Sequence, residues 1–248
     1  MLQAHEDAYG NNIYDRYMHG YGGYDIVECE DGQFTLNGDS DTYTQPFEEW
    51  DGIQKAAARL VKGRVLDIGC GGGKHAVYFQ EKGIEIVGID NSPLAIAVSE
   101  FRGLQQAWVK GIDDISPEWG LFDTILLLGN NWGLLSNREK AKTILRNLYE
   151  CTSPHALILA ETLDPYSIVF ENEDDREYQR WNRLRGRMTG QLKVRIRYRK
   201  FVTPWHDYLF VSKAEMADIL QDTGWHIRET IENETLEQYI AVLVKSVF

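Results

Sequence analysis

The 248-residue chain has only three cysteines, Cys29, Cys70 and Cys151, and they form no C-x-x-C pair. Thiols so few and so far apart are typical of a reduced intracellular protein and argue against a disulfide scaffold. The six histidines are scattered, and no H-x-x-x-H occurs. The sequence therefore predicts that the protein holds no metal, zinc included.

Long apolar runs and an excess of basic residues are missing too. No run approaches the ~20 apolar residues of a membrane span, and the polar, aromatic N-terminus lacks the regions of a signal peptide. These absences predict a cytoplasmic protein with no membrane partner. The net charge of −12 argues against a nucleic-acid partner, because non-specific binding to a duplex usually needs a basic face.

What the chain does have is a glycine-rich turn at residues 65–73, VLDIGCGGG. A short apolar run leads into an acid and three alternating glycines: Asp67, Gly69, Gly71 and Gly73. Glycine permits positive φ and carries no Cβ, so the backbone can turn sharply and pass close to a ligand. A second apolar run ends at Asp90, whose carboxylate can accept two hydrogen bonds from a ribose diol. This pairing predicts a ligand that contains a nucleoside.

The glycine spacing separates the candidate nucleotide ligands. The dinucleotide fingerprint G-x-G-x-x-G would need glycine in place of Lys74 or Ala76. A P-loop is excluded as well, since no G-x-x-x-x-G-K-[ST] occurs. The observed D-x-G-x-G-x-G resembles motif I of the class I S-adenosylmethionine-dependent methyltransferases. In that family the loop surrounds the methionine end of the cofactor.

The resemblance continues in order over about residues 60–162. Residues 111–115, GIDDI, resemble the segment whose acid contacts adenine, and either Asp113 or Asp114 fits that role. Residues 122–128 resemble the fourth strand of the family, and 129–135 resemble the loop that faces the transferred methyl group. The resemblance implies S-adenosylmethionine as the cofactor. The implied cofactor-binding residues are Asp67, Gly69, Cys70, Gly71, Gly73, Asp90, Asn91, Asp113, Asp114, Gly129 and Asn130.

Alternating strand and helix patterns predict an α/β fold, with a doubly wound, mostly parallel, seven-stranded sheet of the Rossmann-like methyltransferase type. We expect an N-terminal arm or lid at residues 1–46 and a methyltransferase domain at 47–248. Within that domain we expect a substrate-side insertion at 163–211, before the last helix. Tyr14 and Tyr17 are the arm residues expected to cover the cofactor.

The insertion contains residues 192–202, LKVRIRYRKFV, in which apolar and basic side chains alternate. Period two predicts a single half-buried strand. Its basic face, which carries Arg195 and Arg197, has two open interpretations. Cationic side chains on an edge strand block pairing between molecules, whereas guanidinium forks can bind an anionic acceptor. We expect the insertion to cap the carboxyl ends of the sheet strands.

The implied chemistry is an in-line displacement at a sulfonium, for which the protein supplies orientation and exclusion of water. The candidate bases are His206, which precedes Asp207, and Asn131 in the loop after the fourth strand. We expect a small-molecule acceptor. An RNA or protein methyltransferase and a non-catalytic cofactor-binding protein stay open as alternatives. Neither the acceptor nor the oligomeric state can be predicted from these patterns.

Overall fold

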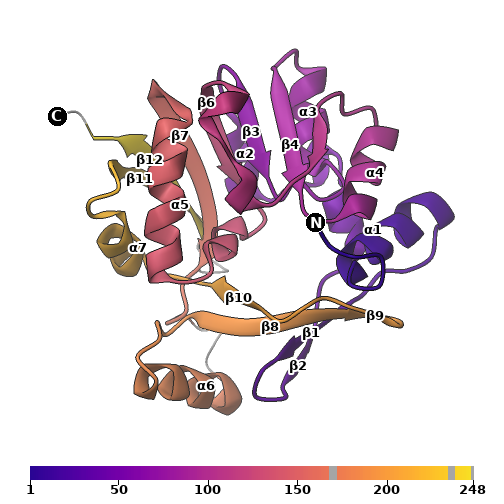
Figure 1. The fold of residues 1–248 in the computed structure, drawn as a ribbon, viewed down its shortest axis with the longest axis vertical. Coiled ribbons are helices and arrows are strands. Elements are labelled where there is room, and N and C mark those ends of the chain that lie inside the picture. Colours follow the sequence, from indigo (N-terminus) through magenta and orange to yellow (C-terminus); the bar gives the residue numbers. More distant parts are fainter. Residues whose placement is uncertain (168–171, 234–237, 247–248) are drawn as a thin grey trace. The chain divides into compact units, whose positions relative to one another are not determined.

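The computed structural model describes residues 1–167, 172–233 and 238–246. It contains a seven-stranded sheet, helices, and a second sheet of five strands (Figure 1). Residues 168–171 of the predicted insertion lie outside the described residues. Within the described ranges, no helix combines the length and the apolar character needed to cross a membrane.

The large sheet has the predicted Rossmann-like order of strands. In spatial order these are β11 (Trp225–Glu232), β12 (Gln238–Lys245), β7 (Thr152–Leu163), β6 (Phe122–Leu127), β3 (Val65–Ile68), β4 (Ile86–Asp90) and β5 (Ala107–Val109). The pairs β3–β4, β4–β5 and β6–β7 are parallel. Strand β12 runs antiparallel to both of its neighbours, β7 and β11. The predicted α/β fold of the Rossmann-like methyltransferase type is confirmed.

The strands and helices form where the sequence favours them. Every residue of β3 is buried, as expected for an apolar strand of a mainly parallel sheet that is covered on both faces. Ser92 caps α4, Pro93 follows at its first position, and Ser212 with Glu215 forms a capping box at the start of α7. The helices are α1 (Ala8–His19), α2 (Gly52–Ala58), α3 (Lys74–Glu81), α4 (Pro93–Phe101), α5 (Arg138–Glu150), α6 (Glu173–Leu184) and α7 (Lys213–Leu220). Short 3-10 helices are η1 (Ser40–Tyr43), η2 (Phe47–Glu49), η3 (Ile112–Asp114), η4 (Pro117–Trp119) and η5 (Asn131–Leu135).

The second sheet joins the predicted arm to the predicted insertion. Its strands are β10 (His206–Leu209), β8 (Gln191–Tyr198), β1 (Ile26–Cys29) and β2 (Phe34–Leu36), in that order, with β9 (Phe201–Val202) also paired to β8. Strand β1 pairs antiparallel with both β2 and β8. Strands β1 and β2 belong to the arm, and the pairing of β1 with the insertion was not predicted. Segments more than 150 residues apart in the sequence thus share one sheet.

The prediction of one continuous strand over residues 192–202 was wrong. Strand β8 ends at Tyr198, Arg199 takes a left-handed φ of 53°, and β9 returns antiparallel. Tyr198 pairs with Phe201, so the chain makes a two-residue hairpin turn, for which positive φ is the usual requirement. Because the paired residues Tyr198 and Phe201 share a face, the alternation changes phase across the turn, and the two consecutive basic residues Arg199 and Lys200 were the available signal.

The edge-strand interpretation of the basic residues was also wrong, because β8 lies between β10 and β1. Its basic face lies beside a carboxylate of the neighbouring strand. Arg195 donates through Nε and Nη2 to Glu28 at 2.7 Å each, and Arg197 also donates to Glu28. These hydrogen bonds lower the pKa of Glu28 to about 2. Arg195 further stacks on the Trp205 ring at 4.4 Å. Glu28 therefore balances part of the positive charge of this face within the chain.

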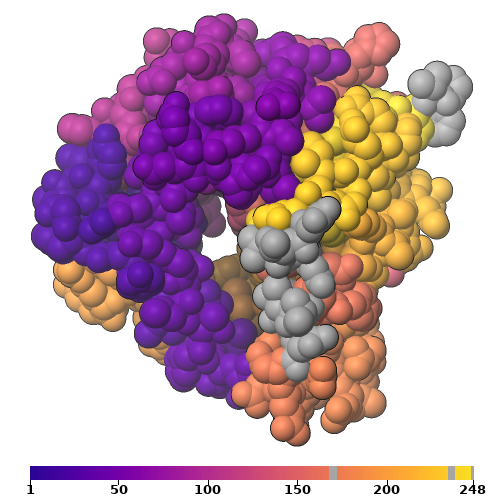
Figure 2. All heavy atoms as spheres, turned by 180° about the vertical axis from the view of Figure 1, so that it is seen from behind, coloured from indigo at the N-terminus to yellow at the C-terminus, as the bar shows by residue number. Residues whose placement is uncertain are grey.

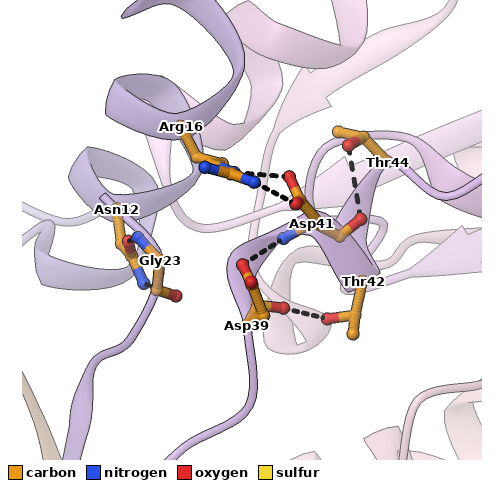
Figure 3. A network of polar contacts seen from close by, with 7 residues as sticks. All are labelled: Asn12, Arg16, Gly23, Asp39, Asp41, Thr42 and Thr44. Atoms are coloured by element: carbon orange, nitrogen blue, oxygen red, sulfur yellow. Dashed lines mark hydrogen bonds and ion pairs between the residues drawn. The ribbon is translucent and has the colours of Figure 1, made fainter. Parts of the chain in front are cut away.

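The chain separates into two compact units. The first comprises residues 1–50, 62–114 and 193–206, and the second comprises 51–61, 115–192 and 207–248. In the first unit the arm is held by its own polar contacts, which Figure 3 shows: Arg16 forks onto Asp41, and the Asn12 carboxamide exchanges hydrogen bonds with the Gly23 backbone. Figure 2 shows the indigo arm on the surface beside purple residues of the same unit.

Candidate functional site

The glycine loop after β3 has the conformation that its sequence requires. Gly69, Gly71 and Gly73 have φ of 72°, 55° and 80°, values that residues with a Cβ rarely adopt. The amides of Gly69 and Cys70 both donate to the carbonyl of Ile89, at 2.8 and 3.0 Å, and so extend the pairing of β3 with β4. Because these two amides already donate within the protein, they are not available to a ligand. The glycines instead allow a ligand to come close to the loop backbone.

Asp90 ends β4 beside this loop, as predicted. Its Oδ2 accepts from the Gly71 amide at 3.0 Å, and its Oδ1 accepts from the Ser92 amide at 2.9 Å. The side chain is 9% exposed, and burial raises the pKa of its carboxyl to about 6. Each carboxylate oxygen has two lone pairs, so Asp90 keeps the capacity to accept from further donors.

Asp67, near the carboxyl end of β3, is a buried acid beside the loop. The residue is 1% exposed, and its Oδ2 has no hydrogen-bond partner among the described residues. Burial, and next the charge of Asp90, raise the pKa of its carboxyl to about 7. A buried polar atom without a partner costs free energy. This orphaned oxygen marks a position where a hydrogen-bond donor from a ligand would be stabilising.

Three further residues that were predicted to bind the cofactor are Cys70, Gly73 and Asn91. The Cys70 sulfur packs against Gly88, where an added Cβ would lie 3.0 Å away, and burial raises the pKa of this thiol. Gly73 has the same role toward α4, because a Cβ there would lie 3.0 Å from Ser99 Oγ. Asn91 is exposed, and its carbonyl accepts from the Leu2 amide at 3.1 Å. Cys70 and Gly73 therefore shape the loop through packing.

The arm lies against the glycine loop through residues other than those expected. A Cβ on Gly71 would lie 3.7 Å from the Tyr43 ring, and one on Gly72 would lie 2.9 Å from Thr44. The Tyr43 ring packs edge-on against Tyr9, with centroids 4.7 Å apart. Burial raises the pKa of Tyr9, and the charges of Asp25 and Asp90 add to the effect.

Tyr14 and Tyr17, the two tyrosines expected to cover the cofactor, contact other parts of the first unit. Tyr14 packs on a buried cluster that includes Val98 of α4. Tyr17 is 40% exposed and contacts Phe101 edge-on. Beside the glycine loop lies Tyr43 rather than Tyr14 or Tyr17, and which tyrosine lies there depends on how the arm folds back.

Of the two acids expected near adenine, one closes its own turn. Asp114 Oδ2 accepts from the Gly111 amide at 2.8 Å, so this carboxylate holds the η3 turn together. Asp113 is exposed beside it in the same 3-10 helix. The structure thus brings the loop residues, Asp90, Asn91, Asp113 and Asp114 together in the first unit.

The predicted residues of the methyl-facing loop belong to the second unit. Gly129 and Asn130 both have positive φ, 71° and 64°, and Asn131 begins η5. A left-handed asparagine is strained backbone of the kind that gathers at functional sites. The Gly129 amide donates to Glu161 at 2.7 Å, and the Asn130 carbonyl accepts from the Tyr208 hydroxyl at 2.6 Å.

Glu161 and Tyr208 were missed as candidates. Glu161 is an acid inside the apolar run ALILAETL, and that placement was the available signal. The other candidate base, His206, lies in the first unit, where its ring is exposed and its Nδ1 lies 3.1 Å from the Pro204 carbonyl oxygen. Among the described residues, no group of three or more histidine, cysteine or acidic side chains could hold a metal ion.

Comparison with known proteins identifies the family to which this site belongs. Residues 44–230 match the sequence model of a family described as the methyltransferase domain. The chain belongs to this methyltransferase family. The match spans most of the chain, so the predicted class I S-adenosylmethionine-dependent methyltransferase is confirmed.

A solved relative supports the cofactor as well. This methyltransferase is 25% identical to the S-adenosylmethionine-dependent methyltransferase of Bacteroides fragilis, whose crystal structure contains S-adenosyl-L-homocysteine. The two superpose with a TM-score of 0.84, over 100% of this chain and 98% of the other. The predicted cofactor, S-adenosylmethionine, is thereby confirmed.

Curated relatives differ in their acceptors. The tRNA U34 carboxymethyltransferase of Methylococcus capsulatus is 34% identical over 122 residues, which cover 46% of this chain and 36% of that protein. The glycine/sarcosine N-methyltransferase of Halorhodospira halochloris is 25% identical over 104 residues, 40% of this chain and 39% of that protein. The chain therefore matches less than half the length of these relatives, and their acceptors differ in chemical class.

Proposed function

We propose that this methyltransferase transfers the methyl group of S-adenosylmethionine to a small-molecule acceptor. When bound, the cofactor supplies an electrophilic methyl group on a sulfonium. The chain's own residues bind and orient the reactants and exclude water. The observation that carries the proposal is the buried pair of acids, Asp67 and Asp90, at the two strand ends that flank a left-handed glycine loop.

The residues present fit this cofactor. The Asp90 carboxylate, oriented by two backbone amides, keeps lone pairs for the two ribose hydroxyls. The partnerless Oδ2 of Asp67 suits the ammonium of the methionine end, because a charged donor offsets the cost of a buried carboxylate. We assign the adenine contact to the Asp113 end of η3, since Asp114 already closes the turn.

We propose that residues 1–46 act as a lid over this site, as part of the same function. Two sets of hydrogen bonds attach the arm to the rest of the first unit. The Asp7 carboxylate accepts from the Leu94 and Gly10 amides, at 3.2 and 3.0 Å. Arg102 donates to the carbonyls of Gly72 and Thr44, at 2.6 and 3.1 Å. Closing a cover of this kind excludes water from a sulfonium that is to react with a chosen acceptor.

Charge supports a small acceptor over a nucleic acid. The net charge is −12, and the arginines of β8 that could hold phosphates share a carboxylate, Glu28. Arg199 likewise pairs with Asp15 at 3.2 Å. A nucleic-acid acceptor is held mainly by cationic contacts to its phosphates. These guanidinium groups already have carboxylate partners within the protein, so binding phosphates would compete with those ion pairs.

An RNA acceptor is the second candidate, and one observation favours it. Several curated relatives carry the name tRNA U34 carboxymethyltransferase, although each match covers no more than half of this chain. A protein acceptor and a non-catalytic role have no comparable support.

Labelled methyl transfer separates these possibilities. The protein is incubated with methyl-tritiated S-adenosylmethionine and, in parallel, with a small-molecule cell extract, total tRNA, or a peptide pool. We expect label in the small-molecule fraction, and none with an Asp90→Ala variant. Label in tRNA alone would replace the proposed acceptor by RNA. No label in any fraction, from protein that binds the cofactor, would favour the non-catalytic alternative.

A further inference from the structure

Glu161 is a carboxylate in the interior of the second unit. It lies in β7 opposite Ile240 of β12 and is fully buried. Its Oε2 accepts from Gln54 Nε2 at 2.9 Å and from the Gly129 amide at 2.7 Å. Its Oε1 accepts from Gln238 Nε2. A buried charge is costly unless several donors compensate it, and an apolar residue here would fill the same space at less cost. The carboxylate therefore needs an explanation other than packing.

The group that Glu161 holds is the start of the loop after β6. Gly129 and Asn130 are consecutive left-handed residues, and asparagine in this conformation is strained. Such a backbone persists only when its surroundings fix it. Glu161 fixes the amide of Gly129, and Gln238 Nε2 lies 3.5 Å from Asn130 Oδ1.

Tyr208 of β10 holds the same loop from another element. Its hydroxyl donates to the Asn130 carbonyl at 2.6 Å. Its ring lies against Gly133, where a Cβ would come within 2.1 Å of ring carbons, so only glycine fits under it. Farther along the loop, Trp132 and Leu135 are fully buried. Both the entry and the middle of the loop are thus fixed by side chains from distant parts of the chain.

We propose that Glu161 and Tyr208 are positioning residues, which set the backbone of residues 129–131 for the methyl transfer. The inference rests on the proposed function, in which this loop faces the transferred methyl group. Glu161 acts on the loop through the Gly129 amide, and Tyr208 acts through the Asn130 carbonyl. Neither residue is assigned a contact with the acceptor or the cofactor. Misplacing such a loop by a fraction of an ångström is enough to slow an in-line displacement.

Tyr208→Phe is the sharpest test, because it removes one hydroxyl and leaves the ring on Gly133. Tyr166→Phe is the matched control: that hydroxyl also bonds within the second unit, to Thr189 and Glu215 at 3.0 Å each. We expect Tyr208→Phe to speed amide hydrogen exchange in residues 129–135 by about tenfold, the scale of one lost hydrogen bond. Tyr166→Phe should leave exchange in those residues unchanged.

The same variants separate positioning from a merely structural role. With the acceptor fraction identified by labelled transfer, Tyr208→Phe should lower kcat about tenfold at saturating S-adenosylmethionine. Its KM for the cofactor should stay within about threefold, because only a transition-state interaction is weakened. Glu161→Gln, which keeps an oxygen for Gly129, should retain more activity than Glu161→Ala.

The outcomes distinguish this inference from the proposed function. If Tyr208→Phe and Glu161→Gln leave both loop exchange and kcat at the wild-type level, the positioning role is wrong. If the wild-type protein transfers no methyl group to any fraction, the proposed function fails. Loop exchange in Tyr208→Phe then still decides whether Tyr208 holds the loop, and an unchanged rate would overturn that too.

Discussion

Asp67→Asn tests how much the buried carboxylate beside the glycine loop costs in stability. The substitution keeps the shape of the side chain and removes its charge. In the wild-type protein the carboxyl pKa rises from 3.8 to about 7, because the group is buried and lies near Asp90. The unfolded chain releases this proton near pH 3.8 and the folded protein near pH 7. The native state therefore binds more protons in that window, and its free energy of unfolding falls as the pH rises.

The size of the effect follows from the shift. The full shift corresponds to about 4 kcal/mol of destabilisation, complete above pH 7 and absent below pH 3.8. As the pH rises from about 5.5 to about 8, titration of this group should reduce the free energy of unfolding of the wild-type protein by about 2 kcal/mol. Asp67→Asn lacks the titrating group, so its stability relative to wild type should rise by that amount over the same interval.

Urea denaturation of the cofactor-free protein at several pH values measures this difference. Asp51→Asn is the control, since Asp51 caps α2, where asparagine is an equally good cap. It should show no such slope relative to wild type. Asp67→Asn should also weaken S-adenosylhomocysteine binding by about 10- to 100-fold, because an amide lacks the charge that pairs with an ammonium. A stability difference that does not change with pH, or unchanged binding, would refute the reasoning.

Three other variants test separate parts of the site. Gly71→Val should abolish cofactor binding, because valine cannot easily adopt the φ of 55° that this loop position requires. Normal binding in calorimetry would contradict the assignment of this loop to the cofactor. Arg195→Gln with Arg197→Gln should destabilise the fold in urea denaturation, because Glu28 loses its charged donors. A raised acceptor KM at unchanged stability would instead support anion recognition. His206→Ala should lower kcat by ~10²-fold and remove a limb of the pH profile if His206 is the general base, whereas a flat profile would leave orientation and water exclusion as the mechanism.

The sheet and the cofactor loop could be predicted because their signals are local. Each signal is contained in a few consecutive residues: the apolar run of β3, the alternating glycines, and Asp90 at the end of β4. A buried parallel strand that turns sharply into a helix requires such residues. The capping box at Ser212 was likewise readable from four residues.

The second sheet could not be predicted, because it depends on pairing between Glu28 and Arg195, which are far apart in sequence. The strand pattern of residues 192–198 was visible, but its partner was not. The choice of Tyr9 and Tyr43 over Tyr14 and Tyr17 depends in the same way on how the arm folds back. Helix α6 was not among the predicted elements, even though acids fill its first turn.

Titration calorimetry with S-adenosylhomocysteine and with NAD, on wild-type protein and Asp90→Ala, tests the central claim most directly. We predict that the wild-type protein binds S-adenosylhomocysteine at micromolar to sub-millimolar strength and does not bind NAD. In Asp90→Ala the binding free energy should fall by about 2–4 kcal/mol, the scale of charge-assisted hydrogen bonds to two ribose hydroxyls. Tighter binding of NAD, or unchanged affinity in a folded Asp90→Ala variant, would contradict this account of the site.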